Sequence, residues 1–401
     1  MKCPVCKSLK IKELFRKKNF PYFTSPLSAL KLRKLNQILK NKKKTQNLNV
    51  VFCESCTHTF LKNIPDTKTL NELYNKFYNY PSPLKKSFEP IRDNKFLKIF
   101  NEQKKMLKLQ SRVLEVGCFD GYILSKIKSS FNVFGCDPSP GALIGRKKGL
   151  NIERSFFSKD TFGRKTFDII IARHIIEHIL NLDNFLKNIT SKLSKNGKLI
   201  LEIPNINFFL KSGLPSVFSL QHIQYFNHSS IEKLLANNNF KILKLKYSDD
   251  NLIIFSQKSK IKIKIKYKKN LGFHKKFINK HKVVEKKIKV YFAKNRIKKN
   301  NLVIWGAGGF GVGFLKFFNI NLNLIKHFVD TDRKKNNCKY YGIKKQIFFP
   351  MSKNINCAKI LIITSMYSNE ILKDIIKRKI NIKIITLFPQ LKFYNLGQIT
   401  G

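Results

Sequence analysis

Short apolar runs alternate with helix-like stretches through the middle of the chain, from about residue 106 to residue 256. Continuous apolar runs bounded by turn residues are typical of strands that are buried on both faces of a parallel sheet. Strands that alternate with helices predict an α/β domain with a parallel sheet. The pattern returns at residues 301–305, so we expect a second, Rossmann-like α/β unit over residues 301–401.

The remaining segments differ in composition from these two units. Residues 1–63 hold two Cys-x-x-Cys pairs, and residues 64–105 are aromatic and polar, as expected of a connecting helix and loop. Residues 257–300 are rich in lysine: Ile261, Ile263 and Ile265 alternate like an edge strand, and residues 273–298 predict an exposed basic helix. A chain of 401 residues is too long for one ordinary domain, which agrees with this division.

A glycine turn follows the first strand of the central domain. The strand at residues 112–116 runs into Gly117 and Gly121, and a helix is predicted over residues 122–128. A second strand, residues 132–136, ends at Asp137. Backbone N–H groups at such a turn approach a ligand, and an acid at the tip of the second strand holds ribose hydroxyls in doubly wound folds. The pair predicts a nucleoside-containing cofactor.

The residues of the turn indicate which cofactor this is. Phe119 stands between the two glycines, which disfavours binding of a pyrophosphate, and Glu115 ends the strand. These residues resemble the first motif of class I S-adenosylmethionine-dependent methyltransferases, in which the acid lies near the methionyl amino group; Phe119 departs from the glycine frequent there. The resemblance implies cofactor contacts from the following positions: Glu115, Gly117, Cys118, Phe119, Gly121, Asp137, Pro138 and His174.

Two later segments carry histidines. Residues 167–179 resemble the fourth-strand motif of the same enzymes, and on the helix expected after it His174 and His178 share one face beside Glu177. This trio lacks an obvious further metal ligand, so we expect it to line the cofactor and substrate cleft. Residues 221–226 predict a polar and aromatic loop over the strand ends, where His222 either takes a proton or packs against the next helix.

The two Cys-x-x-Cys pairs are the most specific metal signal in the chain. Their four thiolates would complete a closed tetrahedral site, which predicts a structural Zn²⁺ held by Cys3, Cys6, Cys53 and Cys56. The other four cysteines are scattered, and we expect them to be small buried residues.

A complete Gly-x-Gly-x-x-Gly spans Gly306 to Gly311, and Asp330 follows at the end of the next predicted strand. Alone, this would be an NAD signature. In an accessory unit it could equally bind the phosphate of a nucleotide sugar, or nothing.

The net charge of +55 arises from 79 Lys and Arg against 24 Asp and Glu. The excess is nearly all lysine and is spread along the chain, so it indicates solvated faces and codon composition more than a nucleic-acid footprint. It would still attract acidic substrates such as nucleotide sugars. No apolar run is long enough to span a bilayer and no signal core is visible, which predicts a cytoplasmic protein.

The order of these parts resembles the nucleotide-sugar C-methyltransferases. That resemblance implies an N-terminal zinc-binding domain, a seven-stranded Rossmann-like methyltransferase core over residues 106–256 and a C-terminal Rossmann-like domain. It also implies a keto-sugar substrate and an enolate that attacks the sulfonium methyl group, with His222 as base. The catalytic candidates are His222, His178, Tyr80 and Tyr225.

The family's Tyr-x-Glu-His loop reads Ser219-Leu220-Gln221-His222 in this chain, so O-methylation of a sugar hydroxyl competes with C-methylation. The sequence therefore predicts a methyltransferase that acts on a nucleotide-linked sugar in glycan synthesis. An RNA methyltransferase, a non-catalytic relative and a sugar oxidoreductase that uses the second glycine loop are the alternatives.

Overall fold

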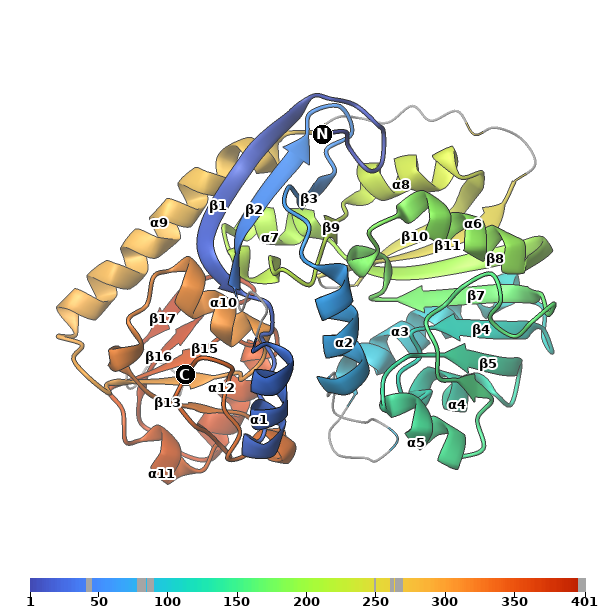
Figure 1. The fold of residues 1–401 in the computed structure, drawn as a ribbon. Coiled ribbons are helices and arrows are strands. Elements are labelled where there is room, and N and C mark those ends of the chain that lie inside the picture. The colour runs from blue at the N-terminus through green and yellow to red at the C-terminus, as the bar shows by residue number, and fades with distance from the viewer. Residues whose placement is uncertain are drawn as a thin grey trace. The chain divides into compact units, whose positions relative to one another are not determined.

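The computed structural model describes residues 1–40, 45–77, 84, 90–248, 250–259, 263 and 270–395 (Figure 1). The chain divides into two compact units, each built from separate stretches. Unit 1 contains Met1–Leu14, Asn49–Asn207 and Gln221–Leu271, and unit 2 contains Phe15–Leu48, Phe208–Leu220 and Gly272–Gly401. Residues 1–63, predicted as one N-terminal domain, are thus shared between the two units.

A mixed seven-stranded sheet forms the centre of unit 1, in the order β10-β11-β8-β7-β4-β5-β6 (Figure 1). The strands from β6 to β8 are parallel, whereas β11 runs antiparallel to β8 and to β10. Their bounds are β4 (Arg112–Val116), β5 (Asn132–Cys136), β6 (Ile152–Glu153), β7 (Phe167–Arg173), β8 (Leu193–Pro204), β10 (Phe240–Ser248) and β11 (Asn251–Lys258). The α/β class is as predicted, but the sheet is mixed and not wholly parallel, because β11 pairs antiparallel with β8 and with β10.

Helices and short strands complete unit 1. The helices that lie wholly within it are α2 (Thr67–Phe77), α3 (Ile91–Glu102), α4 (Tyr122–Ile127), α5 (Gly141–Lys147), α6 (Leu182–Lys192) and α8 (His228–Asn237), with 3₁₀ turns η2 (Lys104–Met106) and η3 (Ile176–His178). Strand β3 (Thr59–Leu61) pairs with β9 (Gln224–Tyr225) and with β2 (Thr45–Cys53), whereas β1 (Ile11–Pro21), β2 and α7 (Ile206–Ser212) each pass from one unit to the other.

Alternate residues of the central strands enter two different apolar clusters. Val113 and Ile169 pack in a cluster with Phe96 and Phe100 of α3, whereas the neighbouring Leu114 packs in a second cluster with residues of α6 and α8. A strand directs successive side chains to opposite faces, so both faces of this sheet are buried. The second cluster also contains Cys3, Cys53 and Cys56, which explains why the cysteine-bearing segments belong to unit 1.

Unit 2 has its own six-stranded sheet, in the order β14-β13-β12-β15-β16-β17. Its strands are β12 (Leu302–Trp305), β13 (Ile325–Val329), β14 (Ile347–Phe348), β15 (Ile360–Ile363), β16 (Lys383–Thr386) and β17 (Lys392–Tyr394). Its helices are α1 (Ala29–Ile38), α9 (Gly272–Lys294), α10 (Gly309–Phe317), α11 (Ser352–Ile355) and α12 (Ser368–Lys377), and its 3₁₀ turns are η4 (Pro215–Val217), η5 (Leu322–Leu324) and η6 (Arg333–Lys335). The predicted basic helix is α9, which buries one stripe at His274, Phe277, Val284 and Ile288.

Two local predictions concern the segments that follow β7 and β11. The helix expected to carry His174 and His178 on one face is wrong: His174 has a φ of 53°, only the short turn η3 follows, and α6 begins later, where the side chain of Asn181 accepts a hydrogen bond from Asn184 N. The edge strand expected near Ile263 lies mostly outside the described residues, and Ile263 itself has no regular structure. Within the described ranges, no helix is both long and apolar enough to cross a bilayer.

Candidate active site

The glycine turn after β4 depends on its two glycines. Gly117 has a φ of +71° and Gly121 a φ of +75°, in the region that favours glycine. A Cβ atom on Gly117 would lie 2.1 Å from Cδ1 of Ile175, and one on Gly121 would lie 2.6 Å from Cδ1 of Leu150. Neither position has space for a side chain, so the turn holds its shape ahead of α4.

Asp137 holds this turn in place from the end of β5. Its Oδ2 accepts a hydrogen bond of 2.9 Å from Phe119 N, and its Oδ1 accepts one of 2.8 Å from Ser139 N. Burial raises the pKa of Asp137, while these hydrogen bonds oppose the rise. A carboxylate oxygen accepts more than one hydrogen bond, so ribose hydroxyls remain possible partners. Phe119 keeps a left-handed φ of 50°.

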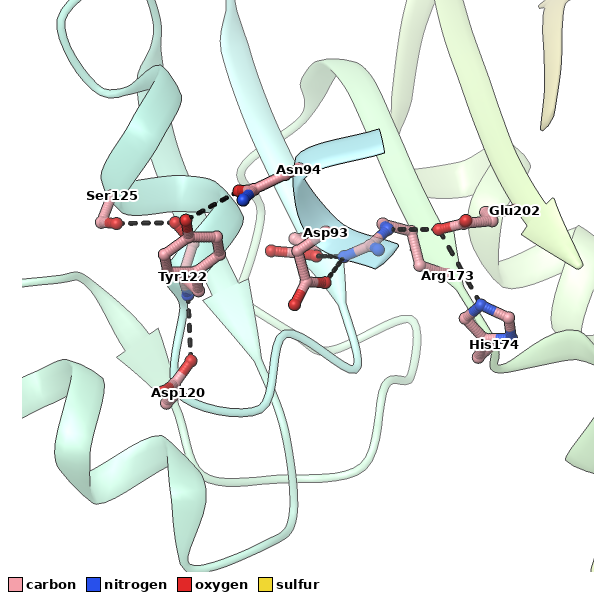
Figure 2. A network of polar contacts seen from close by, with 9 residues as sticks. Asp93, Asn94, Asp120, Tyr122, Ser125, Arg173, His174 and Glu202 are labelled. Carbon is pink, nitrogen blue, oxygen red and sulfur yellow. Dashed lines mark hydrogen bonds and ion pairs between the residues drawn. The ribbon is translucent and has the colours of Figure 1, made fainter. Parts of the chain in front are cut away.

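A largely buried arginine, with 9% of its side chain exposed, lies beside the turn, and the sequence analysis missed it. Arg173, the last residue of β7, pairs through Nη1 with Oδ1 of Asp93 at 2.8 Å and through Nε with Oε2 of Glu202 at 2.7 Å. Figure 2 shows Arg173 between these two carboxylates, with His174 beyond Glu202. Nη1 also lies 3.9 Å from Oε1 of Glu115. The guanidinium of Arg173 therefore lies within ion-pair distance of three carboxylates, which come from three different elements.

Of these three carboxylates, Glu115 has an oxygen atom left without a hydrogen bond among the described residues. Its side chain is buried, and among the described residues its Oε2 has no hydrogen-bond partner. Burial raises the pKa of Glu115 to about 8, although the charge of Arg173 acts in the opposite direction. A buried carboxylate in this state is stabilised by a second cation. The site can therefore accept an ammonium group at Glu115.

The histidines come together from two segments that are far apart in the sequence. The imidazole rings of His178 and His222 lie 4.8 Å apart between centroids, and Nδ1 of His178 lies 2.7 Å from the backbone oxygen of Gln221. Burial lowers the pKa of His178 to about 4 and lowers that of His222 well below its usual value, so both rings are neutral near pH 7. Tyr225 is buried in β9, with its ring centroid 6.1 Å from that of His222.

His174 faces a different set of groups from His178. Its Nδ1 lies 3.3 Å from Oε1 of Glu177, and its Nε2 lies 3.9 Å from Oε2 of Glu202. His174 thus links the arginine network to Glu177. Among the other predicted residues, Cys118 buries its side chain in an apolar cluster with Leu124. Pro138 follows Asp137 directly and is half-buried, and Tyr80 lies outside the described residues.

The four predicted metal ligands converge. Sγ of Cys3 lies 3.5 Å from that of Cys56, and Sγ of Cys6 lies 3.5 Å from that of Cys53. Tetrahedral Zn–S bonds of about 2.3 Å place sulfurs roughly 3.8 Å apart. Ser55 N also donates a hydrogen bond of 3.3 Å to Sγ of Cys53. This donor set fits a closed structural zinc site.

The second glycine loop, in unit 2, is built like the first with one difference. Asp330 accepts hydrogen bonds from Ala307 N at 2.8 Å and from Asp332 N at 2.9 Å, but it also pairs with Nζ of Lys335 at 2.9 Å. Its charge is already compensated within the chain. This arrangement favours a structural role for Asp330.

The comparisons with known proteins concern this part of the chain. Residues 85–245 match a protein family described as a methyltransferase domain. The chain is similar to the ubiquinone biosynthesis O-methyltransferase of Rickettsia prowazekii, at 26% identity over 168 residues that cover 37% of this chain and 65% of the relative. It is also similar to the protein of the same description from Bradyrhizobium diazoefficiens, at 28% identity over 106 residues, 24% of this chain and 41% of the relative. The chain thus spans less than two thirds of the length of either relative.

Among solved structures, the chain is similar to the magnesium protoporphyrin IX methyltransferase of Synechocystis PCC 6803, at 13% identity and a TM-score of 0.38, covering 48% of this chain and 100% of that one. The family match covers the glycine turn, the arginine network and the histidines described above. This segment of the chain is therefore similar to a methyltransferase domain.

Proposed function

We propose that the protein transfers the methyl group of S-adenosylmethionine to a nucleotide-linked sugar, with the cofactor bound at the glycine turn after β4. The observation that carries the proposal is Glu115, a buried carboxylate with an oxygen open to a cation, two residues before Gly117. The methionyl ammonium group supplies that cation. Asp137, held at the other side of the turn, then accepts from the ribose hydroxyls.

In this proposal, Glu177, His178 and His222 line the part of the site that binds the methyl acceptor. In O-methylation, an acceptor O–H bond breaks, the oxygen forms a bond to the methyl carbon, and the S–CH₃ bond breaks to leave neutral S-adenosylhomocysteine. In the simplest case the released proton passes to His222. The names of the relatives favour an oxygen acceptor, and Gln221 in place of the family's glutamate weakens the support for a carbon acceptor. The Cys3, Cys6, Cys53 and Cys56 cluster is proposed to hold structural zinc.

The first test is the binding of S-adenosylhomocysteine, measured by calorimetry in buffers of different ionisation enthalpy. Because the pKa of Glu115 is raised to about 8, this group is protonated in the ligand-free protein near pH 7 and must ionise to meet the ammonium group. We expect release of close to one proton per ligand at pH 7 and almost none above pH 9. Glu115→Gln should abolish the release and weaken binding roughly 10- to 100-fold, as expected for a lost hydrogen bond to a charged group.

The matched control is Asp330→Asn, which changes the corresponding acid of unit 2 and should leave the affinity unchanged. Asp137→Ala should weaken binding. Retention of wild-type affinity in both Glu115→Gln and Asp137→Ala would show that the cofactor binds elsewhere.

The second test concerns the acceptor. We expect methyl transfer from radiolabelled S-adenosylmethionine to a nucleoside-diphosphate sugar, with the label found in the product as an O-methyl ether. A carbon acceptor would instead exchange hydrogen with deuterated water at the carbon beside the ketone, because an enolate forms before transfer. Activity on RNA and none on any nucleotide sugar would overturn the proposed substrate class.

A further inference from the structure

The turn η3 and the loop before β9 are held together closely. Ile223 N donates a hydrogen bond of 2.8 Å to the backbone oxygen of Glu177, and Nε2 of Gln224 donates one of 3.1 Å to the backbone oxygen of Ile179. These bonds place Glu177, His178 and His222 in one cluster. One ligand atom from each of the three lies within 4.8 Å of the others.

Glu177 is a buried carboxyl group with one oxygen open to a ligand. Its side chain is only 2% exposed, and Oε2 has no hydrogen-bond partner among the residues that the structure describes. Its Oε1 lies 3.3 Å from Nδ1 of His174. Arg92 acts on Glu177 through its charge, whereas Arg173 is engaged by Asp93, Glu115 and Glu202. Buried carboxylates are paired or bind metals.

The orientation of His178 also suits a metal ligand. A backbone oxygen can only accept, so the 2.7 Å contact with Gln221 requires the proton of the neutral ring to be on Nδ1. Nε2 then carries the lone pair. Metal-bound histidines are commonly oriented in this way, by a carbonyl that accepts from the other ring nitrogen.

We propose that Glu177, His178 and His222 bind a divalent transition-metal cation that activates the methyl acceptor. Two imidazoles and one carboxylate suit Zn²⁺ or Mn²⁺, and three protein ligands leave positions for oxygens of the acceptor. With bonds of about 2.1 Å the ligand atoms would lie roughly 3.0–3.4 Å apart, so small side-chain rotations close the site around the ion.

This inference rests on the proposed function. It assigns the activation of the acceptor hydroxyl to the bound cation and not to His222. The acceptor hydroxyl binds the cation, its O–H bond breaks, and the proton passes to solvent water. An oxygen lone pair then forms the bond to the methyl carbon while the S–CH₃ bond breaks. His222 is a ligand in this arrangement and not the base.

The test is Mn²⁺ binding by calorimetry and electron paramagnetic resonance, on the full chain with its cysteine cluster as purified, since Mn²⁺ prefers oxygen and nitrogen to thiolate. We expect one Mn²⁺ per wild-type chain. Glu177→Gln, which keeps the shape of the side chain, and His222→Ala should each weaken the affinity at least 10-fold. His228→Ala removes an exposed histidine close by in the sequence and should change nothing.

Removal of the cation should lower kcat at least 10-fold and leave S-adenosylhomocysteine affinity unchanged, and Mn²⁺ or Zn²⁺ should restore the rate. If the wild type binds S-adenosylhomocysteine but no Mn²⁺ or Zn²⁺ outside the cysteine cluster, the metal site is wrong and His222 remains the proton acceptor. Binding at full affinity in Glu177→Gln would equally overturn the site. Failure to bind S-adenosylhomocysteine would instead refute the proposed function.

Discussion

Arg173→Met is expected to destabilise unit 1 by about 3–5 kcal/mol, the cost of removing one partner from a buried ion pair. The substitution keeps most of the apolar part of the side chain but removes the guanidinium, whose Cζ lies 4.4 Å from the ring centroid of Phe96. It leaves Asp93, Glu115 and Glu202 without their shared cation. S-adenosylhomocysteine affinity should fall as well, because Glu115 becomes harder to ionise.

Urea denaturation followed by circular dichroism measures this loss, and the fluorescence of Trp305, the single tryptophan, reports unit 2 separately. The deficit should be smaller at pH 5.5 than at pH 8, because protonation of the orphaned carboxylates removes their repulsion. Lys12→Met also removes one positive charge of an ion pair in unit 1, but at a side chain 63% exposed, and should change stability by less than about 1 kcal/mol. Equal effects of the two substitutions would contradict a specific role for Arg173.

Cys56→Ser is expected to abolish zinc binding at the cysteine cluster and to lower the stability of unit 1 by at least about 3 kcal/mol. Structural zinc contributes about 10–16 kcal/mol in isolated zinc-finger peptides, and only part of this is lost where an apolar core remains. Here the cysteines pack in the same cluster as α6 and α8, so loss of the metal should loosen that face of the sheet. Zinc content by mass spectrometry and the midpoint of thermal unfolding measure both effects.

Cys357→Ser is the matched control, since this half-buried cysteine of unit 2 stands apart from the cluster. It should retain the same zinc content as the wild type. If chelation strips the wild type of zinc without lowering its unfolding midpoint, the cluster does not stabilise the fold.

A pH dependence of stability follows from Glu115. Its pKa is raised from 4.5 to about 8 by burial, so the ligand-free folded state holds the proton more tightly than the unfolded state does. The contribution of this group to stability is therefore fully present below about pH 4.5 and is lost as pH rises through 8. The cofactor's ammonium group offsets the loss.

Local patterns were enough to predict much of unit 1. The strands at β4 and β5, the helix at α4 and the positions of Glu115 and Asp137 follow from apolar periodicity and glycine spacing, which depend on neighbours within a few residues. The helix expected at His178 was wrong because the chain after β7 continues its hydrogen bonding through His174 N to the backbone oxygen of Glu202, which excludes a helical start.

The sequence by itself therefore determined the class of fold, the glycine turn and the four cysteines, because each of them follows from the spacing of residues along the chain. Only the tertiary structure decided that Arg173 serves Asp93, Glu115 and Glu202, and that His222 joins Glu177 and His178. These groups come from elements far apart in sequence. Their meeting depends on strand order and on the hydrogen bonds between η3 and the loop before β9, neither of which leaves a periodic signal in the sequence.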